Sequence, residues 1–157
     1  MVIKPFYIHL ILKFRTFAHS ILHGANVWHM VQQVTKGIKI SVETTFEGTF
    51  YKDYKIQYAF GYKVSIENQG KNTVQLSARH WIIKDALNHT TIVSGPGVIG
   101  QKPILKPGES HTYSSGCLLT APFGAMSGHY DMVDFATTSY FKVNIPTFKL
   151  SAPFAIN

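Results

Sequence analysis

The chain has 157 residues, a length typical of one domain with a core of its own. Hydrophobic residues make up 45% of it, aromatic residues 13% and charged residues 15%, which excludes a disordered chain and a coiled coil. The formal net charge of +7 comes without clusters of lysine and arginine, so we expect no nucleic-acid partner. Cys117 is the only cysteine, which excludes an intrachain disulfide and fits a reducing compartment.

Residues 1–29 differ in composition from the rest of the chain. They contain three basic residues and no acidic one, and on a helix their apolar side chains share one face. Three interpretations stay open: sequence upstream of a true start at Met30, an appended amphipathic helix, and a targeting peptide. We therefore expect an N-terminal extension over residues 1–29, with a possible helix, and a domain over residues 30–157. We expect no membrane contact for that domain.

From Ile38 onward, apolar side chains recur at every second residue, the period of a half-buried strand. Turn-forming residues separate the runs, and Lys106–Glu109 has Pro107 and Gly108 where a type II turn requires them. No stretch after Met30 has a helical period with caps. Seven or eight short strands without helices between them predict an all-β fold, an antiparallel β-sandwich. The expected strands cover residues 38–45, 58–67, 74–85, 91–93, 104–105, 110–115, 127–133 and 140–145.

The segment SGPGVIGQKP, residues 94–103, contains Gly95, Gly97 and Gly100 in the spacing G-x-G-x-x-G. This spacing is typical of loops that bind a dinucleotide, but such a loop requires a helix directly after its glycines. Here Pro103 and Pro107 follow, so we expect neither that helix nor a coenzyme. We interpret the glycines as a sharp backbone bend where the chain crosses between sheets.

A second interpretation of the glycine segment stays open. Its backbone N–H groups could form a nest that binds phosphate or a nucleotide polyphosphate without any helix. Lys102 is adjacent in sequence, and Arg79 and His80 come close if the strand over residues 74–85 ends near this segment. This anion-binding function is the alternative hypothesis.

The sequence contains no recognisable catalytic or metal site. His129 and Asp131 are two residues apart on an expected strand and share a face, but two ligands do not make a stable metal site. Cys117 has no neighbour in sequence that would lower its pKa. We therefore predict no enzyme and no bound cofactor, and keep divalent-metal binding only as a third hypothesis.

Four blocks of the sequence carry a family resemblance: VQLSARHWIIKD, SGPGVIGQKPILKPGE, YSSGCLLTAPFGAMSGHYDM and FKVNIPTFKL. Together they resemble the ApaG family (ApaG or DUF525 domain) in order, from about Val31 to Leu150. The resemblance implies a fibronectin type III or immunoglobulin-like sandwich in a small cytoplasmic protein. It also implies a link to cobalt and magnesium tolerance, and interaction modules in related eukaryotic domains. The family has no counterpart to residues 1–29.

These observations predict a cytoplasmic, non-catalytic module that binds another protein through its end loops and an edge strand. The first choice for the contact segment is Ser94–Lys102, with Arg79, His80 and Trp81 beside it, and Tyr113–Leu119 is the second choice. The sequence does not determine the partner or the oligomeric state. The candidate ligand- or partner-binding residues are Gly95, Gly97, Gly100, Lys102, Arg79, His80 and Trp81.

Overall fold

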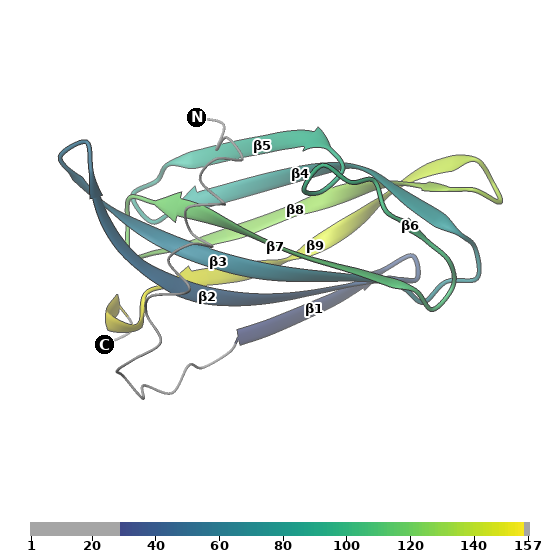
Figure 1. Cartoon of the computed structure of the whole chain (residues 1–157), viewed down its shortest axis with the longest axis horizontal. Coiled ribbons are helices and arrows are strands. Elements are labelled where there is room, and N and C mark those ends of the chain that lie inside the picture. Colours follow the sequence, from purple (N-terminus) through teal and green to yellow (C-terminus); the bar gives the residue numbers. More distant parts are fainter. Residues whose placement is uncertain (1–28, 156–157) are drawn as a thin grey trace.

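The computed structural model describes residues 29–155, so the hypotheses on residues 1–28 lie outside the described residues. Within residues 29–155, no helix is long and apolar enough to cross a membrane. The elements of this part of the chain (Figure 1) are β1 (His29–Thr35), β2 (Ile38–Lys52), β3 (Lys55–Asn68), β4 (Val74–Asp85), β5 (Thr90–Pro96), β6 (Ile104–Leu105), β7 (Ser110–Leu119), β8 (Phe123–Asp134), β9 (Ser139–Ser151) and the short 3-10 turn η1 (Pro153–Ala155).

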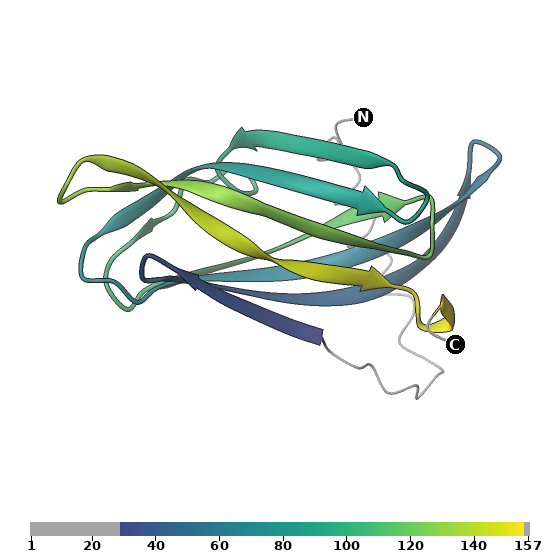
Figure 2. The ribbon, with the colours of Figure 1, turned by 180° about the vertical axis from the view of Figure 1, so that it is seen from behind.

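The strands form two antiparallel sheets that pack face to face (Figures 1 and 2). Sheet A has the strand order β1-β2-β3-β7, and sheet B has the order β5-β4-β8-β9. The short strand β6 also pairs with β4, beyond the end of β5. The predicted all-β antiparallel sandwich is therefore confirmed.

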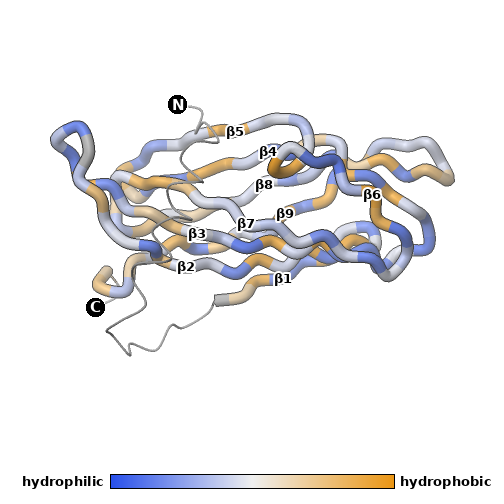
Figure 3. Tube along the Cα trace, viewed as in Figure 1, coloured by the Kyte–Doolittle hydropathy of each residue, from blue (hydrophilic) through white to orange (hydrophobic). Residues whose placement is uncertain are grey.

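The core lies between the sheets and is built from the alternation read in the sequence. In β3, the side chains of Phe60, Tyr62, Val64 and Ile66 are buried, whereas the residues between them are less buried. The same alternation of apolar and polar positions is visible along both sheets in Figure 3. Because successive side chains of a strand point to opposite faces, this pattern buries one face of each sheet.

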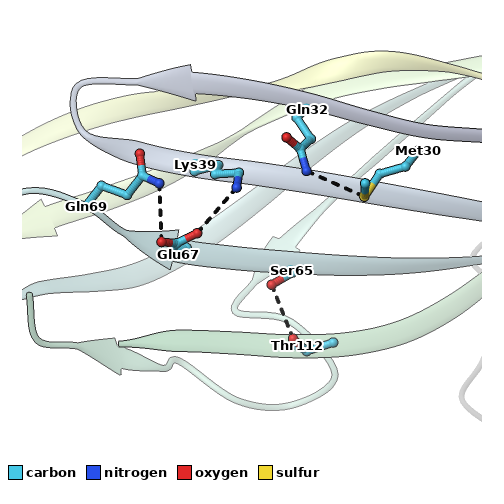
Figure 4. Close-up of polar contacts among 7 residues, drawn as sticks. All are labelled: Met30, Gln32, Lys39, Ser65, Glu67, Gln69 and Thr112. Atoms are coloured by element: carbon cyan, nitrogen blue, oxygen red, sulfur yellow. Dashed lines mark hydrogen bonds and ion pairs between the residues drawn. The ribbon is translucent and has the colours of Figure 1, made fainter. Parts of the chain in front are cut away.

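The outer face of sheet A is polar and forms its own side-chain contacts (Figure 4). Lys39 Nζ lies 3.7 Å from Glu67 Oε2, and Gln69 Nε2 donates to Glu67 Oε1 at 3.2 Å. Further along this face, Thr112 Oγ1 donates to Ser65 Oγ at 3.3 Å. A face whose polar side chains pair with one another in this way is typical of a solvated surface.

Asn68, at the end of β3, is the buried polar residue of the described core. Its Nδ2 donates to the carbonyl oxygens of Asn72 and Leu105 at 2.8 and 2.9 Å, and its Oδ1 accepts from Gly70 N. Its backbone N–H donates to Glu109 O, and its carbonyl accepts from Gly108 N. Asn68 therefore links two of the three places where the described chain passes between the sheets, the β3–β4 and β6–β7 connections; the third is the β7–β8 connection.

The structure differs from the predicted strands in one element and in several ends. The strand β1 was not predicted, because its apolar residues Met30 and Val34 do not recur at every second position. In the structure, these two side chains are 56% and 55% exposed. Backbone pairing with β2 holds it in place, from His29 opposite Thr44 to Thr35 opposite Ile38. Strands β2, β3, β5, β7, β8 and β9 also run further than predicted, because ladder bonds continue beyond the apolar runs.

The first prediction concerns Asn68. Replacing Asn68 with Ala leaves the carbonyls of Asn72 and Leu105 and the N–H of Gly70 without their partner in a buried site. We expect the free energy of unfolding to fall by about 3 kcal/mol, measured by urea denaturation. The control is Gln69→Ala on the exposed neighbour, expected to change stability by less than about 0.5 kcal/mol. Equal effects of the two substitutions would contradict the role given to Asn68.

Candidate functional site: the connection between β5 and β6

The glycine segment lies on one border of sheet B. Strands β5 and β6 pair with the same edge of β4, and residues 97–103 connect them along that edge (Figure 1). The interpretation that the glycines mark a crossing between sheets is therefore wrong. The crossing comes after β6, at the predicted turn, where Glu109 N donates to Lys106 O at 3.0 Å and Gly108 has φ of +82°.

The tip of this connection is a two-residue turn. Val98 and Gln101 exchange both backbone hydrogen bonds, at 2.8 and 2.9 Å. The two residues between them, Ile99 and Gly100, have φ of +47° and +72°, the geometry of a type I′ turn. Positive φ suits glycine, but it strains a β-branched residue such as Ile99. Val98 is 1% exposed and anchors the turn in the core, whereas Ile99 is 51% exposed.

Of the other two glycines, Gly97 is required by a close contact and Gly95 leaves room for a neighbouring side chain. A Cβ on Gly97 would lie 2.1 Å from the carbonyl oxygen of Gln101, so a side chain there would prevent the turn from closing. A Cβ on Gly95 would lie 3.3 to 3.5 Å from the guanidinium atoms of Arg79. Gly97 and Gly100 are therefore explained by the turn itself, and Gly95 lies under the guanidinium of Arg79.

The side chain of Arg79, on β4, holds the β5–β6 connection in place by hydrogen bonds. Its Nη1 donates to the carbonyl oxygens of Pro96 and Gly97 at 3.0 and 2.8 Å. Its guanidinium lies over Gly95, its neighbour across the β4–β5 ladder. The sequence made the proximity of Arg79 to the glycines conditional on where the strand ends, and the structure brings them together through the pairing of β4 with β5. Lys102 also lies there, with its Cγ 3.2 Å from the place of a Cβ on Gly97.

The hydrogen bonds of this connection bear on the two nucleotide hypotheses. The N–H groups of Gly97, Val98 and Gln101 all donate to backbone carbonyls, of Ser77, Gln101 and Val98 respectively. The carbonyls of Pro96 and Gly97 converge on Arg79, which is the opposite polarity to an anion nest. Gly100 is followed by Gln101 and the short strand β6, with no helix to face a pyrophosphate.

His80 belongs to a polar row on the outer face of sheet B. Its Nδ1 lies 2.6 Å from Ser94 Oγ, and its ring stacks on His129 with centroids 4.9 Å apart. His129 Nε2 lies 3.7 Å from Asp131 Oδ1, as their shared face predicted. Burial and the nearby charge of Lys142 lower the pKa of His129 despite Asp131, so this histidine is neutral at neutral pH. Among the described residues, no group of three or more His, Cys, Asp or Glu side chains is placed to hold a metal ion.

Trp81, one of the predicted binding residues, is buried and does not lie on the surface. It is 3% exposed and packs in the core against Tyr62, Tyr130 and Phe148, because it follows His80 on the strand and points to the opposite face. The second-choice segment also turns inward at Cys117, where burial raises the pKa of the thiol to about 12. That thiol is therefore protonated and inert at neutral pH.

Three tyrosines, Tyr62, Tyr113 and Tyr130, are buried in the core. Tyr113 of β7 and Tyr130 of β8 share a hydrogen bond between their hydroxyl groups, which links the two sheets. Burial raises the pKa of Tyr62 to about 12 and also raises the pKa values of Tyr113 and Tyr130. The charge of Arg79 acts in the opposite direction on all three but does not outweigh burial.

Sequence reasoning missed the exposed apolar residues of this border. Ile92 of β5, Ile99 of the turn and Ile104 of β6 are 62%, 51% and 51% exposed. In the sequence, Ile92 and Ile104 stand in expected strands and Ile99 stands in the first-choice contact segment, but hydrophobicity alone does not show which face an edge residue takes. The tip of the β2–β3 hairpin was missed too, where Tyr51 and Tyr54 are 73% and 92% exposed.

Comparison with known proteins gives the family. The family model of the ApaG domain matches residues 49–134, more than half of the chain. The chain belongs to the ApaG family. Protein ApaG of Parvibaculum lavamentivorans is 44% identical over 126 residues, which are 80% of this chain and 96% of that protein. Protein ApaG of Brucella anthropi is 43% identical over 124 residues, 79% of this chain and 95% of its own length.

Solved structures agree with this assignment. The crystal structure of the putative ApaA protein from Bordetella pertussis superposes with a TM-score of 0.68 at 39% sequence identity. The superposition covers 74% of this chain and 94% of that one. The likeness extends over most of the ApaG-type sandwich, so the predicted family resemblance is confirmed.

The second prediction separates the glycines of the turn. We expect Gly97→Ala to destabilise the domain by about 3 kcal/mol or to prevent folding, because the new Cβ meets the Gln101 carbonyl. The new Cβ of Gly100→Ala meets no atom within 4 Å, and only the positive φ is unfavourable for alanine. We therefore expect the free energy of unfolding to fall by about 1 kcal/mol. Thermal or urea denaturation measures both. A cost at Gly100 equal to that at Gly97 would show that the close contact is not decisive.

The third prediction is a pH dependence of stability. Tyr62 has a pKa of about 12 in the folded protein against 10.0 when unfolded, so the unfolded state loses its proton first as pH rises. The folded state then holds more protons, and stability must fall with pH in this range. We expect the unfolding free energy to be unaffected by this group below about pH 9 and to decline between about pH 10 and 12. Urea titrations at several pH values measure it, and Tyr62→Phe should make the decline smaller; the rest comes from Tyr113, Tyr130 and Cys117, whose pKa values burial also raises.

Proposed function

We propose that this ApaG-family chain is a non-catalytic protein-interaction module, and that its contact surface is the β5–β6 border. We define this border as the exposed apolar side chains Ile92, Ile99 and Ile104 with the turn that Arg79 fastens. The observation that carries the proposal is Ile99, a β-branched residue held at φ of +47° and 51% exposed. Such strain costs on the order of 1–2 kcal/mol and is concentrated at functional positions.

The construction of the turn supports this function. Arg79 and the buried Val98 hold it from below, so Ile99 is presented by a rigid element. A rigid apolar residue loses little conformational entropy when it binds, which favours a protein contact.

Catalysis receives no comparable support from the described residues. Ser94 and His80 lie within hydrogen-bond distance, but Asp131 contacts His129 and not His80, so no carboxylate orients the presumed base. A role in cobalt and magnesium tolerance would then act through the partner protein. We include a cytoplasmic location in the proposal, because the free, buried Cys117 is compatible with a reducing compartment.

The fourth prediction tests Ile99 directly. Ile99→Asn relieves the positive-φ strain, since asparagine tolerates this conformation, so we expect stability to rise by about 1 kcal/mol. The same substitution removes the apolar contact, so we expect capture of a bound protein from a cell extract to be lost. Thermal denaturation and quantitative affinity capture measure the two effects. A variant that is more stable and still captures its partner would refute Ile99 as the contact.

The control addresses the anion alternative with the same full-length protein. Because the N–H groups of Gly97, Val98 and Gln101 are engaged, calorimetric titration with pyrophosphate and diadenosine tetraphosphate should show no saturable binding. Cobalt titration tests the third hypothesis in the same way. Micromolar binding of any of these ligands that is lost in Arg79→Gln would replace the protein-interaction proposal.

A further inference from the structure

Strand β5 is the free edge of sheet B. It pairs with β4 on one side, and no other strand of residues 29–155 pairs with its second side (Figure 1). An edge strand presents unpaired backbone N–H and C=O groups to any segment that approaches it in an extended conformation. The opposite edge of the sheet, β9, lies close to β1, where Asn144 N donates to Thr35 Oγ1 at 3.3 Å.

The pairing register shows which backbone groups of β5 face outward. At the two ends of the β4–β5 pair, Gly97 N donates to Ser77 O and Asp85 N donates to His89 O. In an antiparallel pair, hydrogen-bonded positions alternate with positions whose N–H and C=O point away. The residues at 91, 93 and 95 therefore bond to β4. Thr90, Ile92 and Ser94 direct their backbone groups to the free edge.

Strand β5 lacks the usual protection of an edge. Charged side chains and proline commonly prevent strand addition, and β9 has both, with Lys142, Lys149 and Pro146. The sequence of β5, TTIVSGP, has no charged residue, and its proline stands at the last position. Ile92, at the centre of the outward-facing positions, is 62% exposed and lies beside Ile82 of β4.

The charges that border β5 are positive. Lys84 is exposed and pairs with Thr90 at one end, and Lys102 is exposed near Gly97 at the other. Arg79 reaches the same border, where it bonds to Pro96 O. None of these three cations forms an ion pair with a carboxylate among residues 29–155. Asp85, the acidic residue next to Lys84 in sequence, does not pair with it; its carboxylate accepts hydrogen bonds from Thr120 N and Oγ1, both at 2.7 Å.

We propose that β5 receives an extended, acidic segment of a partner protein as an added strand. The segment bonds to the outward N–H and C=O groups of Thr90, Ile92 and Ser94, and an apolar side chain of it packs on Ile92 and Ile82. Acidic side chains of the segment face Lys84 at one end and Lys102 at the other, both of which are exposed. Pro96 has no N–H and ends the ladder. This inference rests on the proposed function and specifies the partner class for the β5–β6 border.

The fifth prediction uses a library of short random peptides displayed on phage and the full-length protein. We expect enriched peptides to alternate β-branched or aromatic residues with others and to carry Asp or Glu. Ile92→Pro removes one outward N–H without removing a bond to β4, so we expect affinity for an enriched peptide to fall on the order of tenfold or more. Ile92→Thr keeps the N–H and is the matched control, expected to bind at least several times more tightly than Ile92→Pro.

A second pair of variants keeps the test valid if Ile92→Pro does not fold. Lys84→Glu should weaken peptide binding and reduce its dependence on salt, because a cation beside the edge becomes an anion. Lys149→Glu on β9 makes the same charge change at the opposite edge and should have no effect. Enriched peptides without acidic residues, or equal binding by both charge variants, would overturn the inference. So would sedimentation showing that a second copy of the chain occupies β5.

The outcomes distinguish this inference from the proposed function. If Ile99→Asn abolishes capture of the partner protein while Ile92→Pro leaves it intact, strand addition is wrong and the turn remains the contact. If neither substitution affects capture, the β5–β6 border is not the interaction surface and both proposals fail. Loss of capture in both variants, with the charge dependence above, supports both.

Discussion

The buried amide of Asn68 is the constraint on which the placement of the candidate surface depends. The chain passes between the sheets after β3 and again after β6, and Asn68 bonds to backbone groups of both connections. A buried amide is stable only when its donors and acceptor are all paired, so it tolerates one arrangement of these connections. Leu105 is one of its partners, and the position of β6 on the border of β4 follows from this bond.

Once β6 is placed, the preceding residues have little freedom. Pro103 O accepts from Leu76 N, Val98 is in the core, and Arg79 bonds to the carbonyls of Pro96 and Gly97. The short connection must then close through a turn with two positive-φ residues, and one of them is Ile99. The strain at Ile99 is therefore maintained by contacts elsewhere in the sandwich, as strained functional residues generally are.

The same arrangement explains why a nucleotide-like motif does not make a nucleotide-like site. A coenzyme loop keeps its backbone N–H groups free to bind the phosphates and is followed by a helix whose dipole attracts them. Here the N–H groups of Gly97, Val98 and Gln101 already donate to backbone carbonyls, and the groups that point towards Arg79 are carbonyl oxygens. The arginine that could have met a phosphate neutralises those carbonyls instead. What the border offers to a partner is apolar side chains, an open ladder and positive charge, which suit a polypeptide.

The sequence by itself determined the alternation in β2, β3 and β4 and the turn at Lys106–Glu109, and it carries the motifs that identify the family. The strands and the turn follow from local chemistry, since a period of two and a Pro-Gly pair act over a few residues. The contact of Arg79 with the glycines depends instead on the pairing of β4 with β5. Only the tertiary structure decided that β1 is a strand, that Trp81 faces the core, and that the glycine segment stays on one sheet. It alone shows the exposure of Ile92 and the strain at Ile99. Those properties depend on which segments lie side by side across the sheets, and side-chain patterns along one strand carry no information about that.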